Sequence, residues 1–191
     1  MGFLSGVLGR KKLKSAKIVL LGASGAGKTT FLKYLETGEP VQEDPLSTLG
    51  IDIRKKPVEI DNWRLTPIDI GGQELYQKSF WNLGMNQADA VVYLIDGLIR
   101  PVNDADNYEI SLFSFEYMLE LLPPVKPILV LINKQDLIEL NPLSTDEATE
   151  LYPFDKLYGR SVIILPSSAK YGDGVDIAIK WLFSKLEESI K

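Results

Sequence analysis

The sequence contains no cysteine and no histidine. Without cysteine, the chain cannot form disulfides, use a thiolate as a nucleophile, or carry a palmitoyl or prenyl group. Without histidine, no imidazole is present to act as a base, a metal ligand or a pH switch. No apolar run reaches the ~18–20 residues that a membrane-spanning helix needs. Residues 1–9 are too few for a signal peptide and lack its leading positive charges, so the sequence predicts a protein of the cytoplasm.

The length of 191 residues suits one globular domain with a full core. The net charge of −5 conceals an asymmetry, because residues 1–35 carry +7 and residues 36–191 carry −12. The acidic part is typical of a solvated surface, and we expect no nucleic-acid partner, whereas the basic start requires a partner of its own. We predict a leader at residues 1–16 and a single domain at residues 17–191.

Short apolar runs rich in Val, Ile and Leu predict buried strands at residues 17–21, 91–95, 128–132 and 162–165. The runs are continuous rather than alternating, which is typical of strands buried on both faces of a parallel sheet. Helical patterns lie between and after these runs. They cover residues 28–35, 110–122 and 175–186, and a capping box at residues 144–147 opens a further helix. Alternating strands and helices predict an α/β fold, with a mostly parallel sheet and helices on both faces.

Residues 51–60 and 63–70 are two apolar segments separated by Asp-Asn, which predicts a β-hairpin with a two-residue turn. Pro57 has no N–H to donate to a neighbouring strand, so the first of these strands should lie at the sheet edge. Its apolar positions change from odd to even numbers between residues 53 and 58. This change of phase predicts a one-residue bulge near residues 55–57.

A phosphate-binding loop is predicted at residues 22–29, which read GASGAGKT and match G-x-x-x-x-G-K-[ST] between a strand and a helix. Backbone N–H groups converge on the phosphates there, and the glycines let the chain approach closely. These groups belong to Ser24, Gly25, Ala26, Gly27, Lys28 and Thr29. Lys28 adds a point charge on the terminal phosphates, Thr29 offers a hydroxyl to Mg²⁺, and Thr30 is placed near the α-phosphate. The motif by itself predicts a nucleoside triphosphate without specifying the base.

The base is predicted by residues 133–136, Asn-Lys-Gln-Asp, which follow an apolar strand and therefore face the ligand crevice of an α/β sheet. Asp136 supplies two acceptors for the paired N1–H and N2–H donors of guanine, which adenine lacks. A site built on such donors rejects the wrong base by roughly 10⁴-fold or more. Asn133 either bonds the ring acceptors or ties this loop to the phosphate loop, and the Lys134 stem lies over the purine face.

A second base contact is predicted where another strand ends, at Ser168, Ala169 and Lys170. The backbone N–H groups of this segment, chiefly that of Ala169, are placed to donate to guanine O6. Together with the phosphate loop and Asp136, this segment indicates GTP and GDP rather than ATP and ADP as ligands. An ATP-dependent kinase is correspondingly disfavoured.

Residues that respond to the γ-phosphate are predicted at the end of the hairpin, where residues 69–73 read Asp-Ile-Gly-Gly-Gln. Asp69 is placed to hold Mg²⁺ through a water, and Thr48 offers a second hydroxyl to the metal only while the γ-phosphate is bound. Gly72 turns its N–H toward that phosphate. Gln73 orients the attacking water, because a neutral amide can donate and accept at once.

Hydrolysis of GTP to GDP and phosphate should be slow for the chain alone. Lys28 and Mg²⁺ are available to stabilise charge on the transition state. No arginine lies in residues 43–46, just before Thr48, where one could act in cis. An arginine from an activating protein adds ~10³–10⁵ in rate. The alternative is a GTP-bound interaction module that does not hydrolyse its nucleotide, which Gln73 argues against.

These motifs resemble the Arf family within the Ras superfamily of small GTPases. The resemblance rests on residues 22–29, 48–50, 69–73, 133–136 and 168–170 and on Trp81. It implies a P-loop G domain with a six-stranded sheet that has one antiparallel edge strand. It also implies a switch between GTP and GDP states with Mg²⁺, exchange factors and GTPase-activating proteins as partners, and a role at membranes in a process such as trafficking or polarity.

The leader combines apolar and basic residues. Phe3, Leu4, Val7 and Leu8 would share one face of a helix, and basic residues follow over residues 10–14. This pattern predicts an interfacial helix that docks residues 2–14 on the cytoplasmic face of a membrane. A helix packed on the protein's own body, or a disordered tail, would also fit. Acylation of Gly2 is weakly signalled, because Gly6 stands where serine or threonine is expected.

Overall fold

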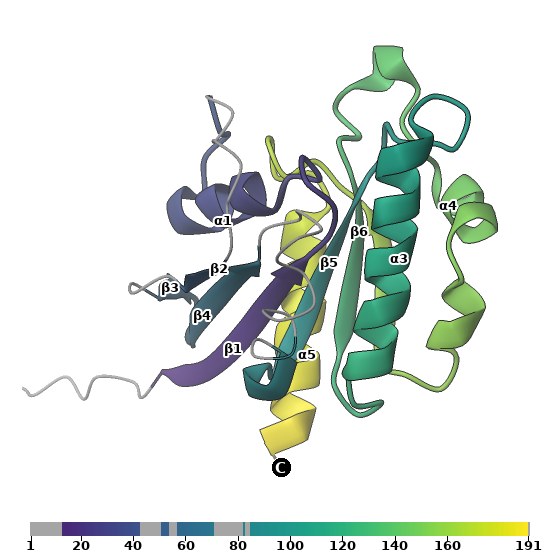
Figure 1. Ribbon diagram of the computed structural model, residues 1–191. Coiled ribbons are helices and arrows are strands. Elements are labelled where there is room, and N and C mark those ends of the chain that lie inside the picture. The colour runs from purple at the N-terminus through teal and green to yellow at the C-terminus, as the bar shows by residue number, and fades with distance from the viewer. Residues whose placement is uncertain (1–12, 43–50, 54–56, 71–81, 83–84, 191) are drawn as a thin grey trace, which may run out of the picture.

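The computed structural model describes residues 13–42, 51–53, 57–70, 82 and 85–190 (Figure 1). Within them, strand segments form one sheet: β1 (Lys14–Leu21), β2 (Ile51–Ile53), β3 (Val58–Ile60), β4 (Trp63–Ile70), β5 (Ala90–Asp96), β6 (Ile128–Asn133) and β7 (Val162–Pro166). The helices are α1 (Lys28–Thr37), α3 (Ala105–Leu121), α4 (Thr145–Leu151) and α5 (Val175–Ile190), with 3₁₀ turns η1 (Ile138–Leu140) and η2 (Phe154–Leu157). None of the helices described is both long and apolar enough to cross a membrane.

The sheet confirms the predicted α/β class. Its order is β2-β4-β1-β5-β6-β7, and β3 also pairs with β4. Strands β4, β1, β5, β6 and β7 run parallel, and β2 and β3 both run antiparallel to β4. Since β2 pairs with the end of β4 and β3 with its start, the two segments form one antiparallel edge of a six-stranded sheet. The predicted edge position of Pro57 follows, because this residue lies between the two segments.

The hairpin forms with the predicted two-residue turn, and Asp61 adopts a left-handed conformation with φ of 53°. Its register corrects the predicted bulge. Ile53 pairs with Ile68 and Val58 with Leu65, so four residues separate these pairs along the edge and two separate them along β4. The edge therefore has two extra residues, not one. Leu65 and Ile68 of β4 belong to the cores on opposite faces of the sheet. The change from odd to even apolar positions along the edge therefore matches the same change along β4.

Two apolar cores lie on opposite faces of the sheet. On one face, Phe115 and Met118 of α3 and Ala148 of α4 pack against β5 and β6. On the other, α1 and α5 cover the sheet (Figure 1), and the Trp63 ring stacks on Phe183 of α5 at 5.3 Å between centroids. All residues of β5 and β6 are buried, as expected for central parallel strands covered on both sides.

Two elements begin earlier than the sequence predicts. Helix α3 starts at Ala105 rather than residue 110, because the Asp104 side chain caps it by accepting the Asn107 N–H at 3.3 Å. Strand β1 starts at Lys14, which pairs with Trp63 in the neighbouring strand and forms an ion pair with Glu187 of α5. Residues 14–16, assigned to the leader from sequence, therefore belong to the sheet, and residues 1–12 lie outside the described part.

Candidate functional site

The predicted phosphate loop connects β1 to α1, as the motif requires. Gly22 and Gly27 have φ of 137° and 98°, a conformation that side chains other than glycine rarely adopt. A Cβ at Gly22 would collide with the Leu94 carbonyl, and one at Gly27 would collide with Asn133 Nδ2. Gly27 is also the N-cap of α1 and offers no side chain to the first turn. The loop is therefore shaped so that a ligand can approach the backbone and the positive end of α1.

Lys28 lies buried inside this loop, with 6% of its surface exposed. Its ammonium donates to the carbonyl oxygens of Gly22 at 3.0 Å and Ala23 at 2.9 Å. These contacts hold the positive charge against the start of the loop, within the span of chain predicted to enclose the phosphates. Thr29 and Thr30 follow in the first turn of α1, and Ser24 and Gly25 form the outer part of the loop.

Asn133, at the end of β6, joins the phosphate loop to the predicted base-binding segments. Its side chain is 3% exposed. The amide Nδ2 donates to the Ala26 carbonyl at 2.8 Å, and Oδ1 accepts the Ala169 N–H at 2.8 Å. Of the two roles left open by the sequence, this geometry favours the link between loops over a bond to the base. The Ala169 N–H donates to Asn133 in this structure, and its bond to guanine O6 stays a prediction.

The predicted base-binding side chains lie together at the carboxyl ends of β6 and β7. The Ser168 hydroxyl donates to Asp136 Oδ1 at 2.7 Å, which fixes the orientation of that carboxylate. Lys134 has φ of 69°, and its ammonium donates to Asp96 Oδ2 at 2.6 Å. With its head group held by Asp96 at the end of β5, the Lys134 stem is free to cover the face of a flat ring.

Lys170 and the residues after it bring the base-binding segment against α1. The Lys170 carbonyl accepts the Val41 N–H at 2.9 Å. Gly172 has φ of 89° and lies so close to Tyr34 of α1 that a Cβ would collide with the tyrosine ring. Burial, and then the charges of Asp176 and Asp173, raises the pKa of Tyr34. The segment is thus held from both the sheet side and the helix side.

Of the residues predicted to hold Mg²⁺, Thr29 and Asp69 lie in the described part of the chain. Asp69 lies near the end of β4 and pairs with Leu20, two residues before the phosphate loop begins. Thr29 comes from the other side of that loop, in α1. The described residues hold no cluster of three or more His, Asp or Glu side chains. One carboxylate, threonine hydroxyls and substrate phosphates match the way Mg²⁺ is usually held, with several waters kept. Thr48, Gly72 and Gln73 lie outside the described residues.

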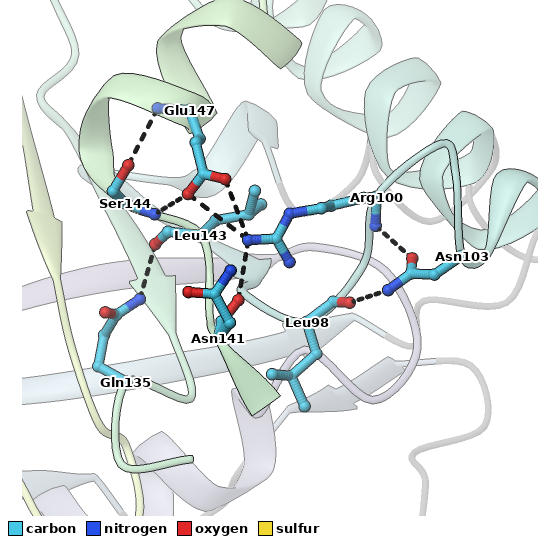
Figure 2. A network of polar contacts seen from close by, with 8 residues as sticks. All are labelled: Leu98, Arg100, Asn103, Gln135, Asn141, Leu143, Ser144 and Glu147. Atoms are coloured by element: carbon cyan, nitrogen blue, oxygen red, sulfur yellow. Dashed lines mark hydrogen bonds and ion pairs between the residues drawn. The ribbon is translucent and has the colours of Figure 1, made fainter. Parts of the chain in front are cut away.

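Three polar residues of this region were not predicted from sequence. Asp96 ends the apolar run of β5 directly opposite Asn133, and that position at a strand end was a usable signal. Gln135, inside the Asn-Lys-Gln-Asp motif, donates from Nε2 to the Leu143 carbonyl at 2.9 Å (Figure 2). Arg100 follows β5 in a loop and belongs to no motif that the sequence reveals.

Comparison with known proteins identifies the family of this chain. The profile of the ADP-ribosylation factor (Arf) family matches residues 4–186. ADP-ribosylation factor-like protein 3 of Chlamydomonas reinhardtii is 34% identical, over 98% of this chain and all of its own length. ADP-ribosylation factor-like protein 1 of Caenorhabditis elegans is 32% identical, over 98% of this chain and 97% of its own.

A solved structure shares the fold. It is the Arl6 BBS3 small GTPase from Trypanosoma brucei with the bound nucleotide analogue GppNp, with a TM-score of 0.74, 21% identity, and coverage of 92% of this chain and 99% of its own. The family match confirms the predicted ligands, GTP and GDP with Mg²⁺, and the predicted hydrolysis of GTP. This chain belongs to the Arf family of small GTPases.

Proposed function

We propose that this GTPase is a molecular switch that acts at the cytoplasmic surface of a membrane and hydrolyses GTP slowly until an activating protein binds. An exchange factor would replace GDP by GTP in this cycle. The proposal takes its chemistry from the family and its residue roles from the motifs.

The observation that supports the residue roles best is the position of Asn133. One buried amide contacts the phosphate loop at Ala26 and the base-binding segment at Ala169. Lys28 and Asp136 therefore lie in loops that a single side chain holds together. A ligand that contacts both must carry phosphate at one end and a donor pair at the other, as a guanine nucleotide does.

The residues divide the work of the reaction. Lys28 and the backbone N–H groups of the loop stabilise charge on the phosphates, and this matters most where charge grows in the transition state. Thr29, Thr48 and Asp69 would hold Mg²⁺, which when bound would neutralise negative charge on the phosphates. Gln73 holds the attacking water in line through its amide. Asp136 selects guanine, and the Ser168 hydroxyl keeps that carboxylate in place.

The assignment of the base can be tested by Asp136→Asn. Xanthine presents a donor at N1 and an acceptor at C2, so it complements an amide as guanine complements a carboxylate. We expect GDP affinity to fall by roughly 10²-fold or more, and xanthosine diphosphate to bind more tightly than GDP. Competition against a fluorescent nucleotide measures both affinities. A variant that still prefers GDP over xanthosine diphosphate would contradict the role of Asp136.

The role of Gln73 can be tested by single-turnover hydrolysis of GTP. We expect Gln73→Leu to slow hydrolysis while nucleotide affinity stays within about twofold, since the glutamine contacts water rather than nucleotide. Equal rates for the two chains would contradict the role. An undetectable rate for the wild type, alone and with added activating proteins of the family, would favour the interaction module that does not hydrolyse GTP.

The membrane role can be tested with vesicles in which about a quarter of the lipid is phosphatidylserine. Each basic residue near an anionic surface contributes ~1 kcal/mol, and salt screens this attraction. We expect the whole chain to sediment with vesicles at low salt and less at high salt. The control is a chain that starts at Leu13, which removes the predicted helix and keeps all of β1. Equal sedimentation of the two chains would contradict membrane docking by the leader.

A further inference from the structure

The segment between β6 and α4 carries the side chains that face the base, yet its outer turn has little apolar support. Ile138 is 78% exposed and Leu140 is 61% exposed. The backbone bonds of this turn are local, as in the Leu140 N–H to the Leu137 carbonyl. Asn141, at the end of η1, has a left-handed φ of 50° that redirects the chain toward α4. The first buried side chain after the turn is that of Leu143, so the turn itself depends on its polar contacts together with that anchor.

Arg100 supplies such contacts, from a loop that is 41 residues away in sequence (Figure 2). Its Nη2 donates to the Asn141 carbonyl at 2.8 Å and lies 3.3 Å from Glu147 Oε1. The Arg100 side chain is 17% exposed, so solvent weakens these contacts less than it would at an open surface. The guanidinium thus contacts the end of the turn and the first turn of α4 at once.

Arg100 is itself held in place by its own loop. Its backbone N–H donates to Asn103 Oδ1 at 2.8 Å, and Asn103 Nδ2 donates to the Leu98 carbonyl at 2.9 Å. The Leu98 N–H donates to Asp96 Oδ1 at 3.0 Å, and the other oxygen of Asp96 accepts the Lys134 ammonium. One short loop therefore contacts the base-facing segment at two places, through Asp96 at its start and through Arg100 at its end.

Glu147 extends these contacts into α4. Its Oε2 accepts the Ser144 N–H at 2.9 Å, and the Ser144 hydroxyl accepts the Glu147 N–H, which completes the predicted capping box. The Ser144 N–H first, and then the Arg100 guanidinium, hold the pKa of Glu147 below its usual value. The carboxylate is therefore charged at neutral pH, and it complements the arginine.

The path from Arg100 to the base is short. The Gln135 side chain donates to the Leu143 carbonyl, and the Leu143 N–H donates to the Gly97 carbonyl at 2.7 Å. Gln135 lies between Lys134 and Asp136, so the segment that Arg100 holds at Asn141 is bonded back to the base-facing motif. This bond joins the part of the segment next to Asn141 to the part next to Asp136.

We propose that Arg100 is a positioning residue for guanine recognition, which holds the segment from Lys134 to Ser144 so that Asp136 meets both donors of the base. The inference rests on the proposed role of Asp136. It assigns to an arginine outside every nucleotide-binding motif a part in how long the nucleotide stays bound and how well guanine is distinguished.

The test is Arg100→Gln, measured by dissociation of fluorescent GDP with Mg²⁺ present. We expect dissociation about 10-fold faster, in line with the loss of a hydrogen-bonded charged group. A second readout separates positioning from general loosening. Hypoxanthine lacks the 2-amino group, so a displaced Asp136 loses more on GDP than on inosine diphosphate. We expect the preference for GDP over inosine diphosphate to fall by about 3- to 10-fold.

Arg160→Gln is the matched control. Arg160 is also partly buried and donates to two backbone carbonyls, those of Leu122 at 2.9 Å and Leu119 at 3.0 Å. It lies two residues before β7, whereas Ser168 lies two residues after the other end of that strand. For Arg160→Gln we expect the rate of GDP dissociation, and the preference for GDP over inosine diphosphate, to stay within about twofold of the wild type.

Two further variants keep the test sharp if Arg100→Gln does not fold. Arg100→Lys retains a positive donor, and we expect it to restore part of the lost preference. Glu147→Gln keeps an acceptor for the capping box but removes the charge that faces Arg100, and we expect dissociation about 2- to 5-fold faster.

The wild type separates this inference from the proposed function. If the wild type binds GDP no better than ADP, both fail. If it prefers GDP, and the Arg100 and Glu147 variants match Arg160→Gln in rate and in base preference, the inference about Arg100 alone is overturned. Faster GDP dissociation with an unchanged preference for GDP over inosine diphosphate would also overturn the inference. Such a result would mean that Arg100 stabilises the loop without positioning Asp136.

Discussion

Replacing Asn133 by alanine tests the link between the two halves of the nucleotide site. The substitution removes a donor to the Ala26 carbonyl and an acceptor for the Ala169 N–H. Both partner residues are buried, at 0% and 1% exposure, so neither group gains water in exchange. A buried polar group left without a partner costs about 1–3 kcal/mol.

The magnitude follows from these two groups. Two orphaned groups at that cost amount to about 2–6 kcal/mol, and local relaxation favours the lower half of that range. We expect Asn133→Ala to lower the free energy of unfolding by about 3 kcal/mol. Because the loops are then no longer joined, we also expect GDP to dissociate at least about tenfold faster.

Urea unfolding at several GDP concentrations, with the ligand contribution RT ln(1 + c/Kd) at free GDP concentration c subtracted for each variant, measures the first effect, since bound ligand shifts apparent stability. Asn133→Asp removes only one of the two hydrogen bonds. It keeps an acceptor for the Ala169 N–H but places a carboxylate oxygen against the Ala26 carbonyl. Asn103→Ala is the control, since this exposed asparagine also makes two bonds and should cost below about 1 kcal/mol in unfolding free energy. A loss for Asn133→Ala as small as that of the control would refute the reasoning.

Three further predictions concern stability. Gly172→Ala should cost about 1–2 kcal/mol in thermal or urea unfolding, because alanine is strained at a φ of 89° and the Tyr34 ring must move aside for the methyl group; no change would mean that this backbone tolerates a side chain. Ser144→Ala should cost about 1 kcal/mol through the lost cap on the Glu147 N–H, and Ser144→Asp should recover most of it, so an equal loss in both would contradict capping. Burial raises the pKa of Tyr152 to about 12, so the unfolded chain releases this proton first and unfolding free energy should fall by about 2–3 kcal/mol between pH 10 and 12. Tyr152→Phe should remove that part of the slope, and an unchanged slope would contradict the shift.

The sequence predicted the sheet well because its central strands are buried on both faces. The continuous apolar runs of β5 and β6 leave no other assignment, and the hairpin was marked by its two-residue turn. The start of α3 was missed because its first turn is polar and is set by the Asp104 cap rather than by apolar spacing. The two extra edge residues were missed because register depends on pairing with β4, which no local pattern records.

In the candidate site, too, some residues could be predicted from sequence and others could not. Residues predicted to touch the ligand directly must satisfy its chemistry, so Lys28 and Asp136 stand in motifs of fixed spacing. Residues that hold those side chains need only reach them in space. Arg100 and Tyr34 come from distant segments and contact a backbone carbonyl or a glycine. No sequence pattern indicates a contact of this kind. Such support is visible only once the fold brings the segments together.

The edge of the sheet carries one more consequence. Sliding a strand by one residue turns every side chain to the opposite face, whereas a slide of two restores each to its own. The alignments of β2 and β3 along β4 differ by such an even step. Both alignments pair odd-numbered residues of the edge with even-numbered residues of β4, or the reverse, so a change from one alignment to the other would leave each edge residue on the same face of the sheet.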